Sequence, residues 1–401
     1  MLRRVFKAFH YRDFRLQWIG ACISSIGTWM QSVAQSWLVL ELSQSPKFLG
    51  LDAFLGQIPI VLFSLVGGVV ADRMDRRKLL VLSQVIQLSC AFLLAGLIAT
   101  GAVRVWQILC LSFIVGTAQA FGGPAYSALI PSLVDKEDLP NAIALNSIQF
   151  NLARVIGPAL GGLAFTKLGY VWCFSLNGLS FIAVIITLTQ LRTQFNPQSS
   201  SESMLGSMKQ GFGFIRNQGA MTGLIILAFT MTALGIPLLT FLPVIAKDVF
   251  QAGPDVFTLM MSISGAGAVC GALIVAALGN IRHKGRVALL MLGALGAGIT
   301  GFALSRSLWL SLVLLFVAGV ALVAVFAMIS SLVQLITSHE MRGRVMSVYN
   351  VAFRGGMPLG ALAAGFFVER FSAPPVLAVN GLLLLALAFY YMLVQRRVAA
   401  L

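Results

Sequence analysis

Long apolar stretches, separated by short polar turns, are the dominant pattern along this chain. A membrane-spanning helix needs about 20 mostly apolar residues, and the chain contains twelve stretches of about that length. The pattern therefore predicts an all-α membrane protein with twelve transmembrane helices. The expected spans are Leu16–Leu40, Phe48–Ala71, Leu79–Ala99, Val105–Ala125, Ala142–Thr166, Val171–Leu191, Ala220–Ala246, Phe257–Leu278, Val287–Ser305, Trp309–Leu335, Val345–Val368 and Pro375–Val394.

Composition and charge support the same interpretation. Only 10% of the 401 residues are charged and 58% are hydrophobic, whereas a soluble domain carries about 25% charged residues. The net charge of +15 would suggest nucleic acid in a soluble protein, but here the positive-inside rule explains it. With both termini in the cytoplasm, 20 of the 28 Lys and Arg residues fall on that side and six on the other. We therefore expect both termini to be cytoplasmic, the bilayer to be the partner, and no nucleic acid to bind.

The chain also divides into two similar halves. A polar stretch predicts a cytoplasmic linker at residues 192–218, between an N-terminal bundle at 1–191 and a C-terminal bundle at 219–401. Each half holds six expected spans, so two pseudo-symmetric six-helix bundles are predicted. At an offset of 199 residues the matching positions are Ala128–Val134 with Ala327–Val333, Asn151 with Asn350, Gly157 with Gly356, and Gly161 with Gly360.

The strongest local motif lies between the second and third spans, at residues 67–78. A basic turn alone explains Arg76, Arg77 and Lys78, but it does not explain the preceding glycines or Asp72. The stretch resembles the Gly-x-x-x-Asp-Arg-x-Gly-Arg-Arg signature of the major facilitator superfamily, with Asp75 where the signature has Gly. We expect Asp75 to adopt the left-handed turn that the Gly would adopt. The resemblance implies a cytoplasmic gate formed by Gly68, Asp72, Arg73, Arg76, Arg77, Arg342 and Arg344.

Two further stretches carry the resemblance across the chain. Residues 27–37 and 154–162 are similar to the enterobactin-exporter and macrolide-efflux branch, and the second stretch resembles the antiporter element Gly-Pro-x-x-Gly-Gly. Span four lacks the membrane arginine of many drug antiporters. The resemblance implies the major facilitator fold, a bacterial inner-membrane location, and export of a siderophore-like or drug-like compound by proton antiport. Bending and close packing are expected at Gly157, Pro158, Gly161, Gly162, Gly356, Pro358 and Gly360.

Polar residues inside the spans are the candidates for a substrate cavity. Arg154 and Arg354 would be costly facing lipid, so each is expected to face a cavity or a partner. Snorkelling or local pairing is the alternative for either arginine, and interhelical packing is the alternative for the serines of span one. Asp52 is the candidate proton carrier, unless it is a rim residue. The expected cavity residues are Trp29, Gln31, Gln35, Asn151, Arg154, Asn350 and Arg354.

These features together predict a secondary transporter that works by alternating access as a monomer. No enzyme activity, cofactor or metal site is expected, because the three histidines lie at span edges, the five cysteines are scattered and no GxxxxGK[ST] sequence is present. The expected partners are a bulky small-molecule substrate, protons and lipid. An importer on the same fold is one alternative. A non-transporting receptor or a membrane-embedded enzyme is an alternative of another class.

Overall fold

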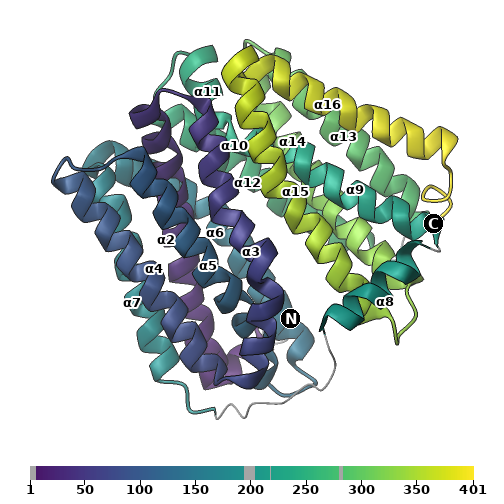
Figure 1. Cartoon of the computed structure of the whole chain (residues 1–401), viewed down its shortest axis with the longest axis horizontal. Coiled ribbons are helices and arrows are strands. Elements are labelled where there is room, and N and C mark those ends of the chain that lie inside the picture. The colour runs from purple at the N-terminus through teal and green to yellow at the C-terminus, as the bar shows by residue number, and fades with distance from the viewer. Residues whose placement is uncertain (1–5, 194–203, 217, 280–282) are drawn as a thin grey trace. The chain divides into compact units, whose positions relative to one another are not determined.

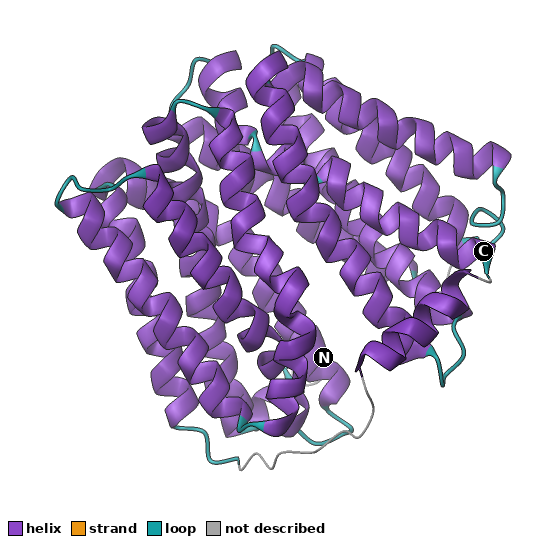
Figure 2. Cartoon of the chain, viewed as in Figure 1, coloured by secondary structure: helices purple, strands orange, loops and turns teal. Residues whose placement is uncertain are grey.

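The computed structural model describes residues 6–193, 204–216, 218–279 and 283–401, and for residues 72, 204–209 and 278 it describes the backbone alone. Within these ranges every regular element is a helix, as Figure 2 shows. The first part of the chain forms η1 (Lys7–His10), α2 (Arg12–Ser43), α3 (Pro46–Arg73), α4 (Arg76–Ala99), α5 (Val105–Leu129), η2 (Ile130–Ser132), α6 (Leu139–Leu168) and α7 (Tyr170–Thr189). The second part forms α8 (Met204–Arg216), α9 (Gly219–Gly235), α10 (Pro237–Thr240), α11 (Leu242–Val244), η3 (Ile245–Val249), α12 (Pro254–Leu278), α13 (Lys284–Leu304), α14 (Leu308–Ile336), α15 (Arg342–Phe371), α16 (Ala373–Phe389) and η4 (Tyr390–Val394).

Ten stretches of helix in the described part of the chain are long and apolar enough to cross a membrane. The expected all-α membrane protein is thus confirmed. Helices α2 and α6, which correspond to the first and fifth expected spans, are not among the ten, although they contain 32 and 30 residues. Their amide, hydroxyl and guanidinium side chains lower their hydropathy. The count of twelve spans remains a prediction.

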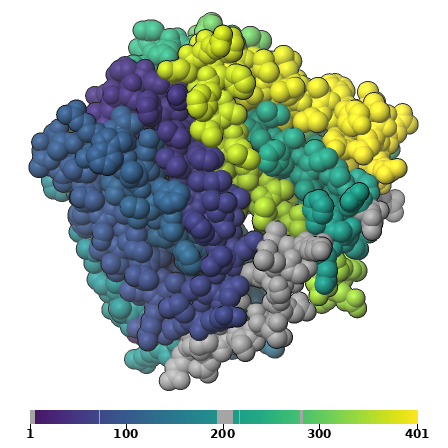
Figure 3. Space-filling view, in the orientation of Figure 1, coloured from purple at the N-terminus to yellow at the C-terminus, as the bar shows by residue number. Residues whose placement is uncertain are grey.

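The outer faces of the helices are apolar. On α16, which lies at the surface in Figure 3, the exposed side chains include Val379, Leu382, Leu383 and Phe389. A soluble protein rarely exposes so continuous an apolar face, whereas lipid solvates it. Three exposed tryptophans lie at helix starts. Trp106 and Trp309 are the second residues of α5 and α14, and Trp172 is the third residue of α7. This position is expected for side chains at a membrane–water interface.

The chain forms two compact units. The N-terminal unit contains Met1–Leu42 and Leu55–Ser201, and the C-terminal unit contains Ser43–Phe54 and Glu202–Leu401. Figure 1 shows α2 to α7 in purple to blue-green and α9 to α16 in teal to yellow. Helix α3 is continuous across the boundary between the units. Its first turns, up to Phe54, belong to the C-terminal unit, and the remainder belongs to the N-terminal unit. Within the segment expected to be a linker, residues 204–216 form the helix α8.

Local signals in the sequence explain where several helices of the N-terminal unit begin and end. Asp75 caps α4, because its Oδ1 accepts hydrogen bonds from the backbone amides of Arg77 at 2.9 Å and Lys78 at 3.4 Å. At the start of α5, Gln107 Oε1 accepts from the amide of Arg104 at 2.7 Å. Gly169, with φ at 84°, ends α6 and lets α7 begin at the next residue.

Glycines allow the same kind of helix contact in both units. In the N-terminal unit, Gly157 of α6 lies against Trp29 and Ile26 of α2, and a Cβ at Gly161 would be 3.0 Å from the carbonyl oxygen of Met30. In the C-terminal unit, a Cβ at Gly356 of α15 would be 2.5 Å from the carbonyl oxygen of Phe229 on α9, and Gly360 lies against the backbone of Ala233. The internal repeat seen in the sequence thus recurs as a repeated contact between backbones.

The two prolines and the further glycine expected at these crossings are buried within the same two helices. Helix α6 continues through Pro158 and helix α15 continues through Pro358, and both prolines are buried. Gly162, beside Gly161, is also buried. The expected close packing at these residues is therefore compatible with two long, continuous helices.

Substitution of Gly157 tests the close contact of α6 with α2. Gly157→Ala should lower the thermal midpoint of the purified protein in detergent, because the added Cβ would lie 3.0 Å from the carbonyl oxygen of Ile26 and closer still to Trp29. Overpacking of this kind costs about 1–3 kcal/mol. The matched control is Gly96→Ala on α4, where an added Cβ meets no described atom within 4 Å. Because Ala favours a helix over Gly by about 1 kcal/mol, the control should be neutral or stabilising. Equal midpoints for the two variants would contradict the contact.

Candidate functional site

The polar face of α2 is largely engaged with neighbouring helices of the same unit. The side-chain amide of Asn177 on α7 donates to Gln31 Oε1 at 2.6 Å, and Gln35 Nε2 donates to Ser112 Oγ on α5 at 2.9 Å. From α6, Gln149 Nε2 donates to Ser25 Oγ at 2.7 Å. Buried amides need such partners, so Gln31 and Gln35 pin α2 to its neighbours. Both were expected to line a substrate cavity, and that expectation remains a prediction.

Trp29 and Arg154 form the most distinctive pair of side chains in the N-terminal unit. Both are half-buried, and the Arg154 Cζ lies 5.9 Å from the centroid of the indole ring. On the same helix as Arg154, Phe150 meets the indole edge-on at a centroid distance of 6.3 Å. Arg154 forms no ion pair among the described residues. A cation held by an aromatic face without a carboxylate attracts an anionic or acceptor-rich group.

The C-terminal unit presents an arginine at a comparable place on α15. Arg354 and Asn350 are both exposed, and their spacing of four residues puts them on one face of the helix. On α6, Asn151 is three residues before Arg154, and its Nδ2 donates to the carbonyl of Ser147 at 2.8 Å. Helices α6 and α15 occupy matching places in the internal repeat. Each of them therefore carries an asparagine and an arginine about one turn apart.

The basic turn between α3 and α4 is held by helix ends of its own unit. Arg76 Nη1 donates to the carbonyl of Ala128 at the end of α5, at 3.0 Å. Arg77 donates to the carbonyls of Leu191, at 3.1 Å, and Thr189 at the end of α7. The last carbonyls of a helix lack intrahelical partners, and positive side chains satisfy them well. These two arginines therefore brace the turn that contains the signature.

One expectation for this turn is wrong. Asp75 does not adopt a left-handed conformation, since its φ and ψ are −60° and 112°, in the extended region. Its carboxylate caps α4 instead, and that function explains why Asp replaces Gly there without strain. Gly68 is half-buried and Arg73 exposed. The side chain of Asp72 lies outside the described residues, so its expected pairing with the start of α15 remains a prediction.

The start of α15 contains the two other arginines expected at a gate. Arg342 is exposed, whereas Arg344 is half-buried and its Nη1 lies 3.7 Å from the sulfur of Met341. Helix α8 packs here, because a Cβ at Gly211 would be 2.6 Å from the carbonyl oxygen of Arg344. The helix in the expected linker thus contacts the first turn of α15.

A contact at the other end of α15 was not predicted from the sequence. Ser45 Oγ donates to Glu369 Oε2 at 2.8 Å, and Lys47 Nζ lies 4.7 Å from the ring centroid of Phe366. A Cβ at Gly50 of α3 would be 3.0 Å from the Cα of Gly365. This hydrogen bond joins two residues that are 324 positions apart, so no local sequence pattern predicts it. The first turns of α3 are therefore tightly packed on α15.

Asp52, the candidate proton carrier, lies in this same segment. It is half-buried in the second turn of α3, two residues after Gly50. A carboxylate in this position is close to the region where α3 and α15 pack together. Whether Asp52 carries protons remains a prediction.

The N-terminal segment is clamped to the start of α6 by charged groups. Lys7 pairs with Asp138 at 2.7 Å, and the Tyr11 hydroxyl donates to Asp135 at 2.9 Å and Asp138 at 3.0 Å. The hydrogen bond from Lys7 lowers the pKa of Asp138 and outweighs the loss of hydration. The hydrogen bond to Asp135 raises the pKa of Tyr11 to about 12. Both shifts move titration away from neutral pH, so the clamp keeps its charges there.

Comparison with known proteins identifies the family. The model of the transmembrane secretion effector family matches residues 5–400. The chain belongs to this family of major facilitator superfamily transporters. It is therefore a transporter and not an enzyme.

Three curated relatives cover almost the whole chain. The chain is 22% identical to the staphyloferrin A transporter of Staphylococcus aureus, over 93% of the chain and 94% of that protein. It is 20% identical to macrolide efflux protein A of Streptococcus pyogenes, over 94% and 96%. It is 26% identical to the enterobactin exporter EntS of Escherichia coli O1:K1, over 96% and 92%. The resemblance to efflux-type members is thus confirmed.

Solved structures support the fold. A bacterial homologue of the human lysosomal transporter Spinster, solved in an inward-facing and occupied conformation, superposes with a TM-score of 0.76. It is 14% identical and the match covers 96% of this chain and 97% of that chain. At this identity the likeness establishes the fold alone.

Proposed function

We propose that this transporter exports a bulky organic compound that carries anionic or acceptor-rich groups, by alternating access. The observation that carries the proposal is the Arg154 guanidinium over the Trp29 ring, with no ion pair for Arg154 among the described residues. An arginine at this depth is expensive unless it has a polar role. An aromatic face beside it suits a large, partly apolar substrate.

The proposal includes α2 and α6 as membrane spans, which gives twelve spans in two six-helix bundles. At 1.5 Å per residue, helices of 32 and 30 residues are longer than the roughly 30 Å hydrocarbon core. Polar side chains are tolerated in such helices when they face a protein interior or a water-filled cavity. The hydrogen bonds of Gln31, Gln35 and Gln149 meet that requirement.

The direction and chemistry of transport are inferred by analogy with the relatives. Those relatives include an enterobactin exporter and a macrolide efflux protein, which favours export over import. We also propose that the protein works by proton antiport as a monomer. Its expected location is the bacterial inner membrane, with both termini in the cytoplasm. An importer on the same fold would load its substrate into right-side-out vesicles, whereas the proposed exporter loads inside-out vesicles. A receptor would load neither.

Transport by the purified protein tests this proposal. In inside-out proteoliposomes with a proton gradient, the wild type should accumulate enterobactin, staphyloferrin A or a macrolide. Arg154→Gln should lower the initial rate about tenfold, because the loss of one charge-assisted contact costs about 1.4 kcal/mol or more. The control is Arg306→Gln, which removes an exposed arginine between α13 and α14 and should leave the rate unchanged. An inert wild type with all three compounds, or equal rates for the two variants, would contradict the proposal.

Two carboxylates are proposed for separate steps, and their neutral variants should differ. Asp52→Asn should abolish proton-driven uptake but preserve substrate exchange, because only the proton carrier is lost. Asp72→Asn should slow both processes and raise the labelling of cysteines placed on the cytoplasmic side, because the gate closes less firmly. A carboxylate at the N-terminus of another helix, here α15, contributes about 0.3–2 kcal/mol. Its loss should therefore shift the equilibrium between closed and open gate several-fold. Wild-type coupling in Asp52→Asn would place the proton carrier elsewhere.

A further inference from the structure

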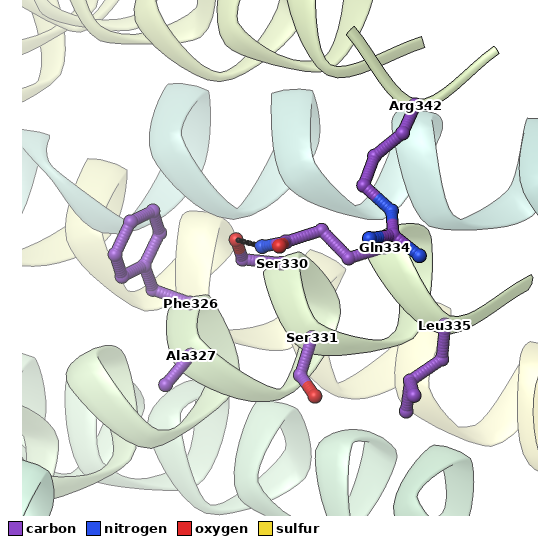
Figure 4. Close-up of a pocket in the computed structure, with 7 residues that line it drawn as sticks. All are labelled: Phe326, Ala327, Ser330, Ser331, Gln334, Leu335 and Arg342. Carbon is purple, nitrogen blue, oxygen red and sulfur yellow. Dashed lines mark hydrogen bonds between the residues drawn. The ribbon is translucent and has the colours of Figure 1, made fainter. Parts of the chain in front are cut away.

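An open hollow lies on the C-terminal unit, between the last turns of α14 and the first residue of α15. Its volume is about 390 Å³, within the roughly 300–1,000 Å³ range of ligand pockets. The α14 residues follow a helical repeat and form one stripe, while Arg342 faces them from α15 (Figure 4). The lining residues are Phe326, Ala327, Ser330, Ser331, Gln334, Leu335 and Arg342.

One end of the hollow is cationic and polar. Figure 4 shows the Arg342 side chain reaching toward Gln334. Arg342 is exposed and forms no ion pair in the described part of the chain, although Glu340 is only two residues away. Gln334 Nε2 makes one long hydrogen bond, 3.4 Å to Ser330 Oγ. A guanidinium beside a side-chain amide matches the needs of a carboxylate.

The other end of the hollow is aromatic. The ring of Phe326 lies 4.6 Å from that of Phe353, tilted by 41°, and the Phe353 ring is stacked with Tyr349 at 6.1 Å and 18°. Phe326 is 38% exposed, so part of its ring is open to a ligand. The Tyr349 side chain at the end of this row is fully buried. A planar ring in the hollow would extend this row of aromatic side chains.

The two ends lie along one stripe of α14. Phe326 and Gln334 are eight residues apart, a helix rise of about 12 Å at 1.5 Å per residue. An aromatic acid that contacts both Phe326 and the polar end of the hollow must bridge most of this length.

We propose that this hollow is a ligand site of its own, which binds an organic anion by placing its carboxylate at Arg342 and its aromatic ring against Phe326. The further assignment, that it receives an acidic aromatic group of the exported compound before transport, rests on the proposed function. The binding site itself does not. Nothing in this proposal requires the Trp29 and Arg154 pair.

The experiment measures protection of a cysteine inside the hollow. Ala327→Cys is introduced after the five native cysteines are replaced by serine, and its reaction with a neutral maleimide is followed in detergent. The probes are 1-naphthoate and its neutral counterpart 1-naphthalenemethanol. Naphthoate should protect at about tenfold lower concentration than the alcohol, because only the acid gains the contact with Arg342. Equal protection by the two probes would overturn the proposal.

Matched variants assign the effect to the two ends of the hollow. Arg342→Gln should remove the preference for the acid, whereas Arg286→Gln, which removes another exposed arginine from a first helical turn, should retain it. Phe326→Ala should weaken the binding of both probes to the same extent. A chain that keeps only native Cys110, exposed on α5, should show no protection. A preference that survives Arg342→Gln would overturn the proposal.

Two further measurements separate the possible failures. Calorimetric titration of the unmodified protein with both probes repeats the comparison without any cysteine replacement, in case the serine background does not fold. Vesicles with phosphatidylglycerol test whether a lipid phosphate occupies the hollow, and protection by that lipid but not by naphthoate would overturn the proposal. Selective binding of naphthoate by a protein that transports none of the test compounds would leave the site standing and refute the proposed function.

Discussion

The close approach of α6 to α2 is the contact on which the arrangement of the N-terminal unit depends. Gly157 and Gly161 lie directly against Trp29 and Met30: an added Cβ at Gly161 would be 3.0 Å from the Met30 carbonyl oxygen, and one at Gly157 would be closer still to the Trp29 Cβ. This approach places the Arg154 guanidinium over the Trp29 ring. In the C-terminal unit, Gly356 and Gly360 bring α15 closer still to α9, because an added Cβ would lie 2.5 Å from the carbonyl oxygen of Phe229 and nearer yet to that of Ala233. Helices in lipid gain little from burying apolar surface, so such close contact is a main source of their association.

Polar side chains divide into two groups once these contacts are in place. The amides of Gln31, Gln35 and Gln149 are spent on neighbouring helices of their own unit, and they secure α2 in its position. The guanidinium groups of Arg154 and Arg342 form no ion pairs among the described residues. Structural polar groups are thereby distinguished from groups available to a ligand, a distinction on which the proposed export of an acidic compound is based.

The sequence predicted the helices well and their side-chain contacts poorly. A stretch such as Leu79–Ala99 is too apolar and too long to be anything other than a buried or membrane helix, and α4 begins three residues earlier because Asp75 caps it. Which helix faces Gln31 is decided by packing, which no local pattern encodes. The same holds for Ser45 and Glu369, which are 324 residues apart. The hollow at Arg342 escaped prediction because it depends on how α14 and α15 meet.

We propose that Trp29 and Arg154 act together on the transported compound. A double-mutant cycle measures this directly, with initial transport rates of wild type, Trp29→Leu, Arg154→Gln and the double variant in proteoliposomes. A cation–π contact is worth about 0.5–2 kcal/mol, so the loss caused by Arg154→Gln should be several-fold smaller when Trp29 is already replaced. Losses that multiply independently in the double variant would contradict the account.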